Sequence, residues 1–162
     1  MIAGLDFSQT APALVTIDSS NKLNILKINT ERFTPKKGTP KEERDKLYKK
    51  RNFYVIKTIG AALENVDTLV IEDYAFAACG RITAIAEMVG YLKYTFKGKI
   101  IMISPNSLKK ALTGKGNATK EMMIRTIQDK YGIPIPDDDD IADAIGLAFI
   151  GKGLIKAKQR IW

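Results

Sequence analysis

Carboxylates at the ends of apolar segments are the residues of this sequence best suited to chemistry. Asp6 and Glu72 each end a run of apolar residues that has the length of a buried strand. Asp140 and Asp143 stand three residues apart at the start of a further apolar segment, a spacing that places both on one face of a helix. Taken alone, Asp6 is equally consistent with a turn residue, and Asp140 with a helix N-cap. A carboxylate buried at a strand end is costly unless it is paired or binds a cation, so the recurrence of the pattern favours a cluster.

A cluster of carboxylates without histidine is typical of a site for a hard cation. The chain has no histidine and one cysteine, which excludes histidine general bases, Ser-His-Asp triads, disulfide frameworks and cysteine-based zinc sites. Mg²⁺ prefers oxygen ligands and is often held by carboxylates together with a substrate phosphate. Two such ions, about 3.5–4 Å apart, can activate a water and stabilise the leaving oxygen of a phosphoryl displacement. We therefore expect a Mg²⁺ site.

The charge of the chain is concentrated in three basic blocks. Residues 36–57 include nine basic and three acidic residues. Residues 93–120 include seven lysines and no acidic residue, and residues 152–160 include four basic residues and no acidic residue. These blocks carry +17, and because the whole chain carries +8, the remainder carries −9. A single lysine-rich block is often only a solvated helix face. Three blocks around an acidic centre favour a polyanionic partner, with nucleic acid ahead of membrane.

The length and hydropathy predict one domain in a reducing compartment. The 162 residues are sufficient for a single core, and we expect one domain over 1–162. No segment approaches the roughly 20 apolar residues of a bilayer span. The first ten residues lack the basic and apolar regions of a secretion signal. We therefore expect no membrane association and a cytoplasmic location.

The order of apolar segments predicts a mixed sheet with helices on its faces. Three successive strands, expected over 2–7, 13–17 and 23–28, favour an antiparallel meander. Two further strands over 68–72 and 99–103 alternate with helical patterns, which favours parallel pairing. The fold class is therefore α/β with a five-stranded mixed sheet.

Helices are expected in the remaining segments. The first should run from Pro40 to about Glu64 with Thr39 as its N-cap, and should turn Tyr48 inward with its apolar residues. The others are expected over about 82–96, over 107–112, from Asn117 or Thr119 to about Lys130, and over 141–150. These helices must bring the acidic pair of the last segment to the strand ends.

The placed carboxylates resemble those of a known family. The order Gly-Leu-Asp6, Val-Ile-Glu72 and Asp140-Ile-Ala-Asp143-Ala resembles that of the RuvC Holliday junction resolvases, which have the RNase H-like fold. The segment 105–120, with lysines at 109 and 120, is similar to the family's segment between its last strand and the next helix. The resemblance covers nearly the whole chain.

The resemblance implies a function and assigns residues to it. It implies a Mg²⁺-dependent DNA endonuclease, with two ions per site and Mn²⁺ as a substitute, that acts as a homodimer. Paired symmetric nicks in a four-way junction would leave 5′-phosphate and 3′-hydroxyl ends. The implied metal ligands and catalytic carboxylates are Asp6, Glu72, Asp140 and Asp143. Lys120 would be catalytic at the scissile phosphate, and the implied DNA contacts are Lys109, Lys110, Lys115, Lys120, Tyr74, Phe76 and Arg81.

Three positions depart from the family pattern. Phe7-Ser8 replaces the usual Pro-Gly after the first aspartate, and the second strand lacks the usual glycines. The family's aromatic wedge falls at Ala75, so Tyr74 or Phe76 would take its place. Such drift resembles phage or other divergent members, in a bacterial cell or a phage-infected host. The dimer contact would lie on the helix near 78–96, through Ala84, Met88 and Tyr91.

Other functions are compatible with the same pattern. A nuclease acting on forks, flaps or other branched DNA would have the same residues. A non-catalytic junction-binding protein is less consistent with four retained carboxylates. An actin-like kinase or ATPase would need a longer chain and a glycine-rich phosphate loop, which the segment around Asp6 lacks.

Overall fold

A six-stranded mixed sheet forms the centre of the molecule. The computed structural model describes residues 1–8, 10–73 and 82–161. The strand order is β3-β2-β1-β4-β5-β6. β1 pairs antiparallel with β2 and parallel with β4, so the antiparallel and parallel halves of the sheet meet at β1. The strands are β1 (Ile2–Asp6), β2 (Ala13–Ile17), β3 (Leu23–Lys27), β4 (Thr68–Glu72), β5 (Lys99–Ile103) and β6 (Arg160–Ile161).

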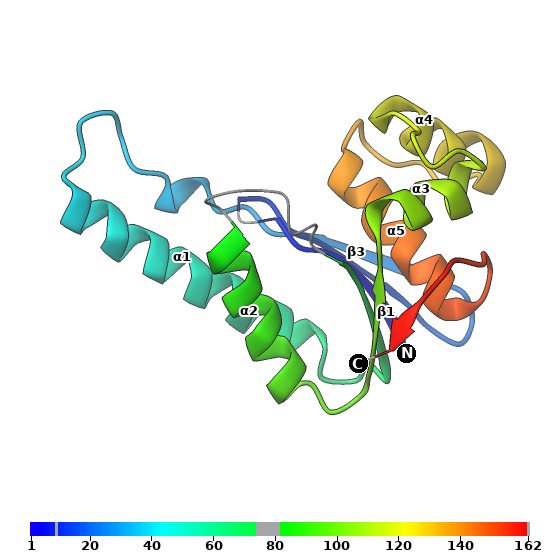
Figure 1. The fold of residues 1–162 in the computed structure, drawn as a ribbon, viewed down its shortest axis with the longest axis horizontal. Helices are drawn as coiled ribbons and strands as arrows, with labels where there is room; N and C mark the ends of the chain where they lie inside the picture. Colours follow the sequence, from blue (N-terminus) through cyan, green and yellow to red (C-terminus); the bar gives the residue numbers. More distant parts are fainter. Residues whose placement is uncertain (9, 74–81, 162) are drawn as a thin grey trace.

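Helices cover both faces of this sheet. α1 (Lys41–Ala62) and α2 (Ile82–Thr95) lie on one face. The other face is covered by α3 (Pro105–Thr113), α4 (Lys120–Arg125) and α5 (Asp139–Lys152), as Figure 1 shows. A short 3₁₀ turn (Glu31–Phe33) precedes α1, and a π-helical turn (Thr126–Lys130) continues α4. Each face of the sheet therefore has its own apolar core.

The two cores are made by alternate residues of the same strands. Leu5 and Leu14 join the core under α1 and α2, whereas Ala13 and Val15 join the core under α5. This alternation follows from the period of two in a strand, where successive side chains point to opposite faces. The inner strands β1, β2 and β4 are buried on both faces, so their sequences are almost continuously apolar.

α5 lies unusually close to β1. A Cβ atom at Gly4 would collide with the backbone carbonyl of Ala144 and the backbone amide of Ala148. Only a residue without a side chain allows this approach. The small residues of α5 serve the same contact from the helix side, since Ala144 and Ala148 are fully buried against the sheet. The result is that the N-terminal turn of α5 reaches the carboxyl ends of β1 and β4.

The predicted fold class is confirmed, with one addition. All five expected strands form, in the expected antiparallel and then parallel arrangement. β6 was not predicted, because a two-residue strand has too little sequence to show alternation.

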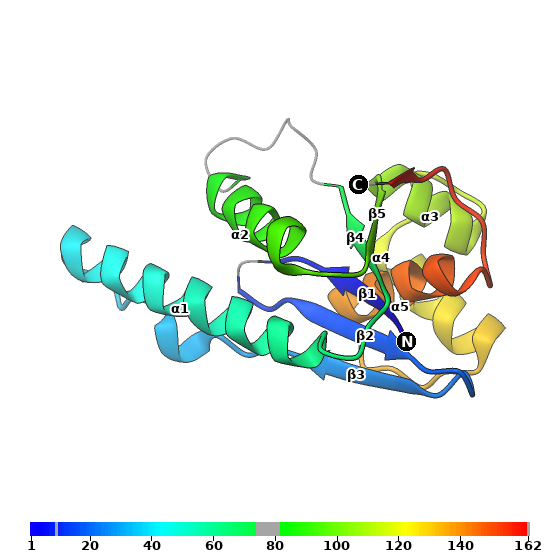
Figure 2. The ribbon, with the colours of Figure 1, turned by 90° about the horizontal axis from the view of Figure 1, so that it is seen from below.

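Two details predicted for the first helix were wrong. Pro40 occupies the N-cap position of α1, while the Thr39 hydroxyl donates to the Lys36 carbonyl instead of capping the helix. Tyr48 was expected to face inward, but it is 38% exposed. Figures 1 and 2 show the reason, since the N-terminal half of α1 extends beyond the edge of the sheet and has no core to face.

No helix in the described part of the chain is both long enough and apolar enough to cross a membrane.

Gly4→Ala should destabilise the protein by about 3 kcal/mol or more, because the obstructing atoms are backbone and cannot rotate away. Gly60→Ala is the matched control, since a Cβ at this helical position meets nothing within 4 Å and should stabilise α1 by up to about 1 kcal/mol. Urea unfolding of both variants measures the difference. Equal stabilities would show that α5 does not need a glycine at position 4.

Candidate active site

Two adjacent strands place Asp6 and Glu72 side by side. β1 and β4 are parallel, and Leu5 pairs with Ile71, so the next residue of each strand is a carboxylate. Both acids point to the face that α5 covers, because successive side chains of a strand alternate between the two faces and Gly4 and Val70, two positions earlier, contact α5. The sequence prediction that these two acids lie together at one sheet edge agrees with this register.

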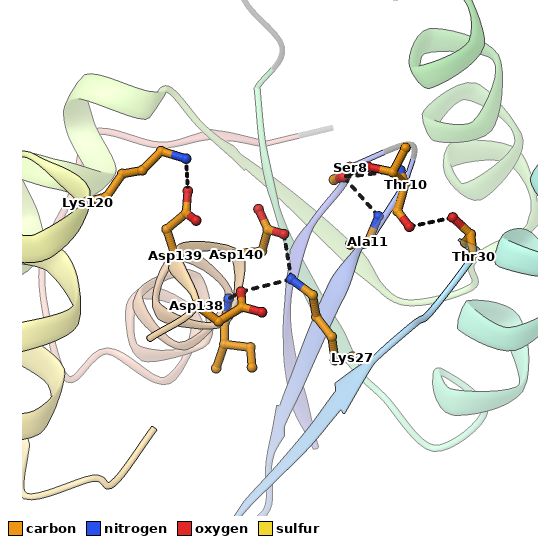
Figure 3. A network of polar contacts seen from close by, with 10 residues as sticks. Ser8, Thr10, Ala11, Lys27, Thr30, Lys120, Asp138, Asp139 and Asp140 are labelled. Atoms are coloured by element: carbon orange, nitrogen blue, oxygen red, sulfur yellow. Dashed lines mark hydrogen bonds and ion pairs between the residues drawn. The ribbon is translucent and has the colours of Figure 1, made fainter. Parts of the chain in front are cut away.

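The turn after Asp6 is held by hydroxyl side chains. The Ser8 hydroxyl accepts hydrogen bonds from the backbone amides of Thr10 and Ala11, at 3.3 and 3.2 Å. The Thr30 hydroxyl donates to the carbonyl of Thr10, which ties this turn to the segment after β3. Ser8, which departs from the Pro-Gly of the resembled family, thus has a defined local role. Figure 3 shows these contacts beside the acidic residues.

The first turn of α5 supplies the other carboxylates. Asp138 is the N-cap, and its side chain accepts a hydrogen bond from the Ile141 amide at 3.2 Å. Asp140 and Asp143 follow on one side of the helix, where the close approach of α5 brings them to the strand ends. Acidic residues are favoured at this position because the N-terminus of a helix carries partial positive charge.

Burial and acidic neighbours raise the pKa values of three of these carboxyl groups. Burial, with the negative charges of Glu72, Asp143 and Asp140, raises the pKa of Asp6 to about 9. Burial and the charge of Asp143 raise the pKa of Glu72 to about 7. Burial and the charge of Asp139 raise the pKa of Asp143 to about 6. These effects favour the protonated form of Asp6 in the absence of a cation, and a side-chain hydrogen bond with Asp140 acts in the same direction.

Two of the predicted lysines lie beside this cluster. The charge of Lys109, on α3, lowers the pKa of both Glu72 and Asp143 and so opposes the effect of burial. Lys120, the first residue of α4, forms an ion pair with Asp139 (Figure 3). The side chain of Lys120 is 71% exposed, so it stands at the rim of the cluster rather than inside it. The structure thus brings Lys109 and Lys120, two of the four lysines in 105–120, to the carboxylates.

A third lysine, which was not predicted, contacts the cluster directly. Lys27, the last residue of β3, donates to Asp138 at 2.8 Å and to Asp140 at 2.5 Å. Figure 3 shows its ammonium group between the two carboxylates. The alternation of 23–28 places Lys27 on the same face as Leu23 and Ile25, which was the available signal. The sequence did not show that this face meets α5.

The remaining predicted residues fall in two groups. Lys110 and Lys115 are exposed on α3 and on the loop that follows it. Tyr74, Phe76 and Arg81 lie outside the described residues. On α2, Met88 was expected to join a dimer contact, but it is 2% exposed and belongs to the core, which excludes it from any surface stripe.

The donor set fits a hard divalent cation. It consists of carboxylate oxygens from three elements, and a bound cation would favour their ionised form against burial and mutual repulsion. Within the described residues, no three acidic side chains converge as a finished set of metal ligands. Instead, Asp140 is paired with Lys27 and Asp139 with Lys120. The residues Asp6, Glu72, Asp140 and Asp143 would hold the cation.

Comparison with solved structures identifies the fold. RuvC of Thermus thermophilus superposes with a TM-score of 0.64 at 18% identity, over 97% of this chain and 99% of the other. The chain has the fold of RuvC. The same enzyme in complex with a Holliday junction substrate also has a TM-score of 0.64, over 98% of its chain.

Two further structures share this fold. The fowlpox virus resolvase, solved with Holliday junction DNA, superposes with a TM-score of 0.55 at 19% identity, over 96% of this chain and 99% of the other. The yeast mitochondrial Holliday junction resolvase Ydc2 superposes with a TM-score of 0.55 at 14% identity, over 91% of this chain and 76% of the other. These structures confirm the expected RNase H-like architecture. No protein-family model matches the sequence.

The raised pKa values predict that cation-free protein loses stability as the pH rises. A folded-state pKa above the unfolded value means that the folded state binds more protons, so the free energy of unfolding falls between about pH 4 and the folded pKa of about 9 for Asp6. Asp6→Asn should flatten this fall and raise the melting temperature in EDTA, by several degrees more at pH 8.5 than at pH 5.

The control for this measurement is Asp45→Asn, an exposed carboxylate on α1. Its melting temperature should follow that of the wild type at both pH values. A parallel pH dependence for wild type and Asp6→Asn would show that Asp6 is not protonated in the folded protein.

Proposed function

We propose that this chain is a Mg²⁺-dependent DNA endonuclease that resolves four-way junctions by paired symmetric nicks. One observation carries the proposal. Carboxylates from β1, β4 and α5 lie together at one sheet edge, where burial and the charges of their acidic neighbours raise the pKa values of Asp6, Glu72 and Asp143. This edge belongs to a fold that is shared with solved resolvases, two of them in complex with Holliday junctions. The Holliday junctions bound in those two complexes support junction DNA as the proposed substrate of this chain.

The carboxylates and the lysines beside them have separate roles in the proposed reaction. Asp6, Glu72, Asp140 and Asp143 bind the cation, with two ions per site and Mn²⁺ as a substitute. When bound, these ions supply an activated water and stabilise the leaving oxygen. Lys120, exposed at the rim, contacts the scissile phosphate and offsets the negative charge that develops on it. Lys109 lowers the pKa of Glu72 and Asp143 against the effect of burial, and so favours their ionised form, which binds a cation.

Exposed lysines extend the proposed DNA surface away from the carboxylates. Lys110 and Lys115 lie on the same α3–α4 segment as Lys109 and Lys120, and both are exposed. This segment, 105–120, contains no acidic residue. Lysines in such a stretch contact phosphates and position the duplex without reading its sequence. We assign the DNA contacts to this segment and to Tyr74, Phe76 and Arg81.

A homodimer would place two such sites on one junction. Three exposed aromatic residues on the α1–α2 face support this assembly, with Phe53 70%, Tyr91 53% and Tyr94 87% exposed. Phe53 and Tyr91 also line a groove of about 620 Å³ between α1 and α2. Aromatic residues are enriched at protein interfaces. The two-fold symmetry of a dimer matches the symmetry of a four-way junction.

Asp143→Asn and Glu72→Gln should reduce Mg²⁺-dependent cleavage of a synthetic four-way junction by about 10²-fold or more, because each removes a cation-binding charge. Junction binding, measured by gel shift in Ca²⁺ or EDTA, should change little. Asp137→Asn is the matched control, because this exposed acid precedes the N-cap of α5 and should keep full activity. Full activity in either of the first two variants would exclude the assigned ligands, and nicks at unpaired sites would favour a broader branched-DNA nuclease.

The substitution Lys110→Ala, alone and combined with Lys115→Ala, should weaken junction binding and flatten its salt dependence. Each lost phosphate contact lowers the slope of log K against log salt by about 0.9 on duplex DNA. Lys22→Ala, in the turn between β2 and β3 at the opposite end of the strands from Asp6, should leave the slope unchanged. Unchanged slopes in all three proteins would mean that the α3–α4 lysines are only a solvated surface.

Tyr94→Ser combined with Tyr91→Ser should convert a dimer into a monomer in sedimentation equilibrium. The reason is that these rings form the exposed apolar part of the α1–α2 face. Tyr48→Ser removes a tyrosine near the projecting end of α1 and should leave the mass unchanged. A monomeric wild type at micromolar concentration would contradict the proposed assembly.

A further inference from the structure

Lys27 lies in one row of residues with Asp6 across three strands. Asp6 pairs with Ala13 on β2, and Ala13 pairs with Lys27 on β3. Directly paired residues point to the same face of a sheet, so all three side chains are on the α5 side. Strands lie about 4.8 Å apart, which separates the Asp6 and Lys27 backbones by roughly 10 Å. The methyl group of Ala13 is the only side chain between them in this row.

Ala13 contributes only a methyl group to this row, between β1 and β3. From the end of β3, Lys27 reaches Asp138 and Asp140 at 2.8 and 2.5 Å (Figure 3). The side chains of Lys27, Asp138 and Asp140 are 27–28% exposed, so the pairs are shielded from much of the solvent. An ion pair in such a place is stronger than a surface pair.

The two partners of Lys27 have different further contacts. Asp138 is the N-cap of α5 and accepts the Ile141 amide, so helix geometry holds it in place. Asp140 has no capping role, and instead shares a hydrogen bond with Asp6 within the carboxylate cluster. Lys27 can therefore release Asp140 and keep a charged partner in Asp138. It is not left unpaired in a partly buried position, which would be costly.

We propose that Lys27 is a positioning residue that serves as an exchangeable counter-ion, which holds Asp140 in the cation-free protein and yields it to the divalent cation while remaining bound to Asp138. This inference rests on the proposed function, because it takes Asp140 as a cation ligand. The ammonium group and the cation compete for the same carboxylate. Lys27 therefore stabilises the empty site and weakens the binding of the cation.

The direction of this effect separates the inference from a purely structural role. A lysine that only supported the shape of the site would weaken cation binding when removed. A competing lysine strengthens cation binding when removed, and at the same time its loss destabilises the cation-free protein. Both effects arise from the same contact, so they should appear together in one variant.

Lys27→Met tests the inference, because methionine keeps an unbranched side chain and removes the charge. Isothermal titration with Mn²⁺ should give a dissociation constant about three- to tenfold lower than that of the wild type, the range of one partly buried charge pair. Melting in EDTA should show a lower transition temperature for the variant, and saturating Mn²⁺ should restore more stability to it than to the wild type. Lys27→Arg, which keeps the charge, should retain the wild-type affinity for Mn²⁺.

Lys22→Met is the matched control, since this exposed lysine immediately precedes the same strand and should leave Mn²⁺ affinity unchanged. Lys27→Gln provides a second uncharged variant if the methionine variant does not fold. An unchanged or raised dissociation constant in an uncharged, folded variant overturns the inference. The inference stands and the nuclease proposal fails if Mn²⁺ binds more tightly to Lys27→Met but no protein cleaves a junction. If the wild type binds no Mn²⁺, that result contradicts both the inference and the nuclease proposal.

Discussion

The close contact between α5 and β1 is the constraint on which the candidate site depends. Gly4 leaves no side chain under the helix, and the buried alanines of α5 bring its backbone against the strand. The first turn of α5 consequently stands above the carboxyl ends of β1 and β4. A helix at an ordinary distance from the sheet would hold Asp143 apart from Glu72, and the electrostatic coupling between these two acids would weaken.

The same contact brings carboxylates close enough to repel one another, and neighbouring basic residues reduce this repulsion only in part. Three basic side chains from three elements, Lys27, Lys109 and Lys120, lie beside the carboxylates. The N-terminus of α5 adds partial positive charge. The pKa values of Asp6, Glu72 and Asp143 nevertheless remain raised, by burial first and by their acidic neighbours second. Repulsion of this kind costs stability and is common where a protein must bind a charged ligand.

The sequence predicted the elements better than the contacts between them. Apolar runs of strand length and acids at their ends were sufficient to predict five strands and the meeting of Asp6 with Glu72. Lys27 was missed because its contact with α5 depends on the register of three strands, which does not follow from local patterns. Tyr48 was placed wrongly for a related reason, since helical periodicity does not show where a helix extends past the sheet that it covers.

The distribution of burial indicates what a bound cation would and would not do. Both apolar cores, one on each side of the sheet, are complete without any of the four carboxylates. Folding therefore draws its stability from the cores, and the acidic edge opposes it in the absence of a cation. In structural metal sites, by contrast, binding of the ion supplies the folding free energy. A cation at this edge would relieve repulsion in a protein that is already folded, which is the arrangement required of a site that loads its metal together with a phosphate substrate.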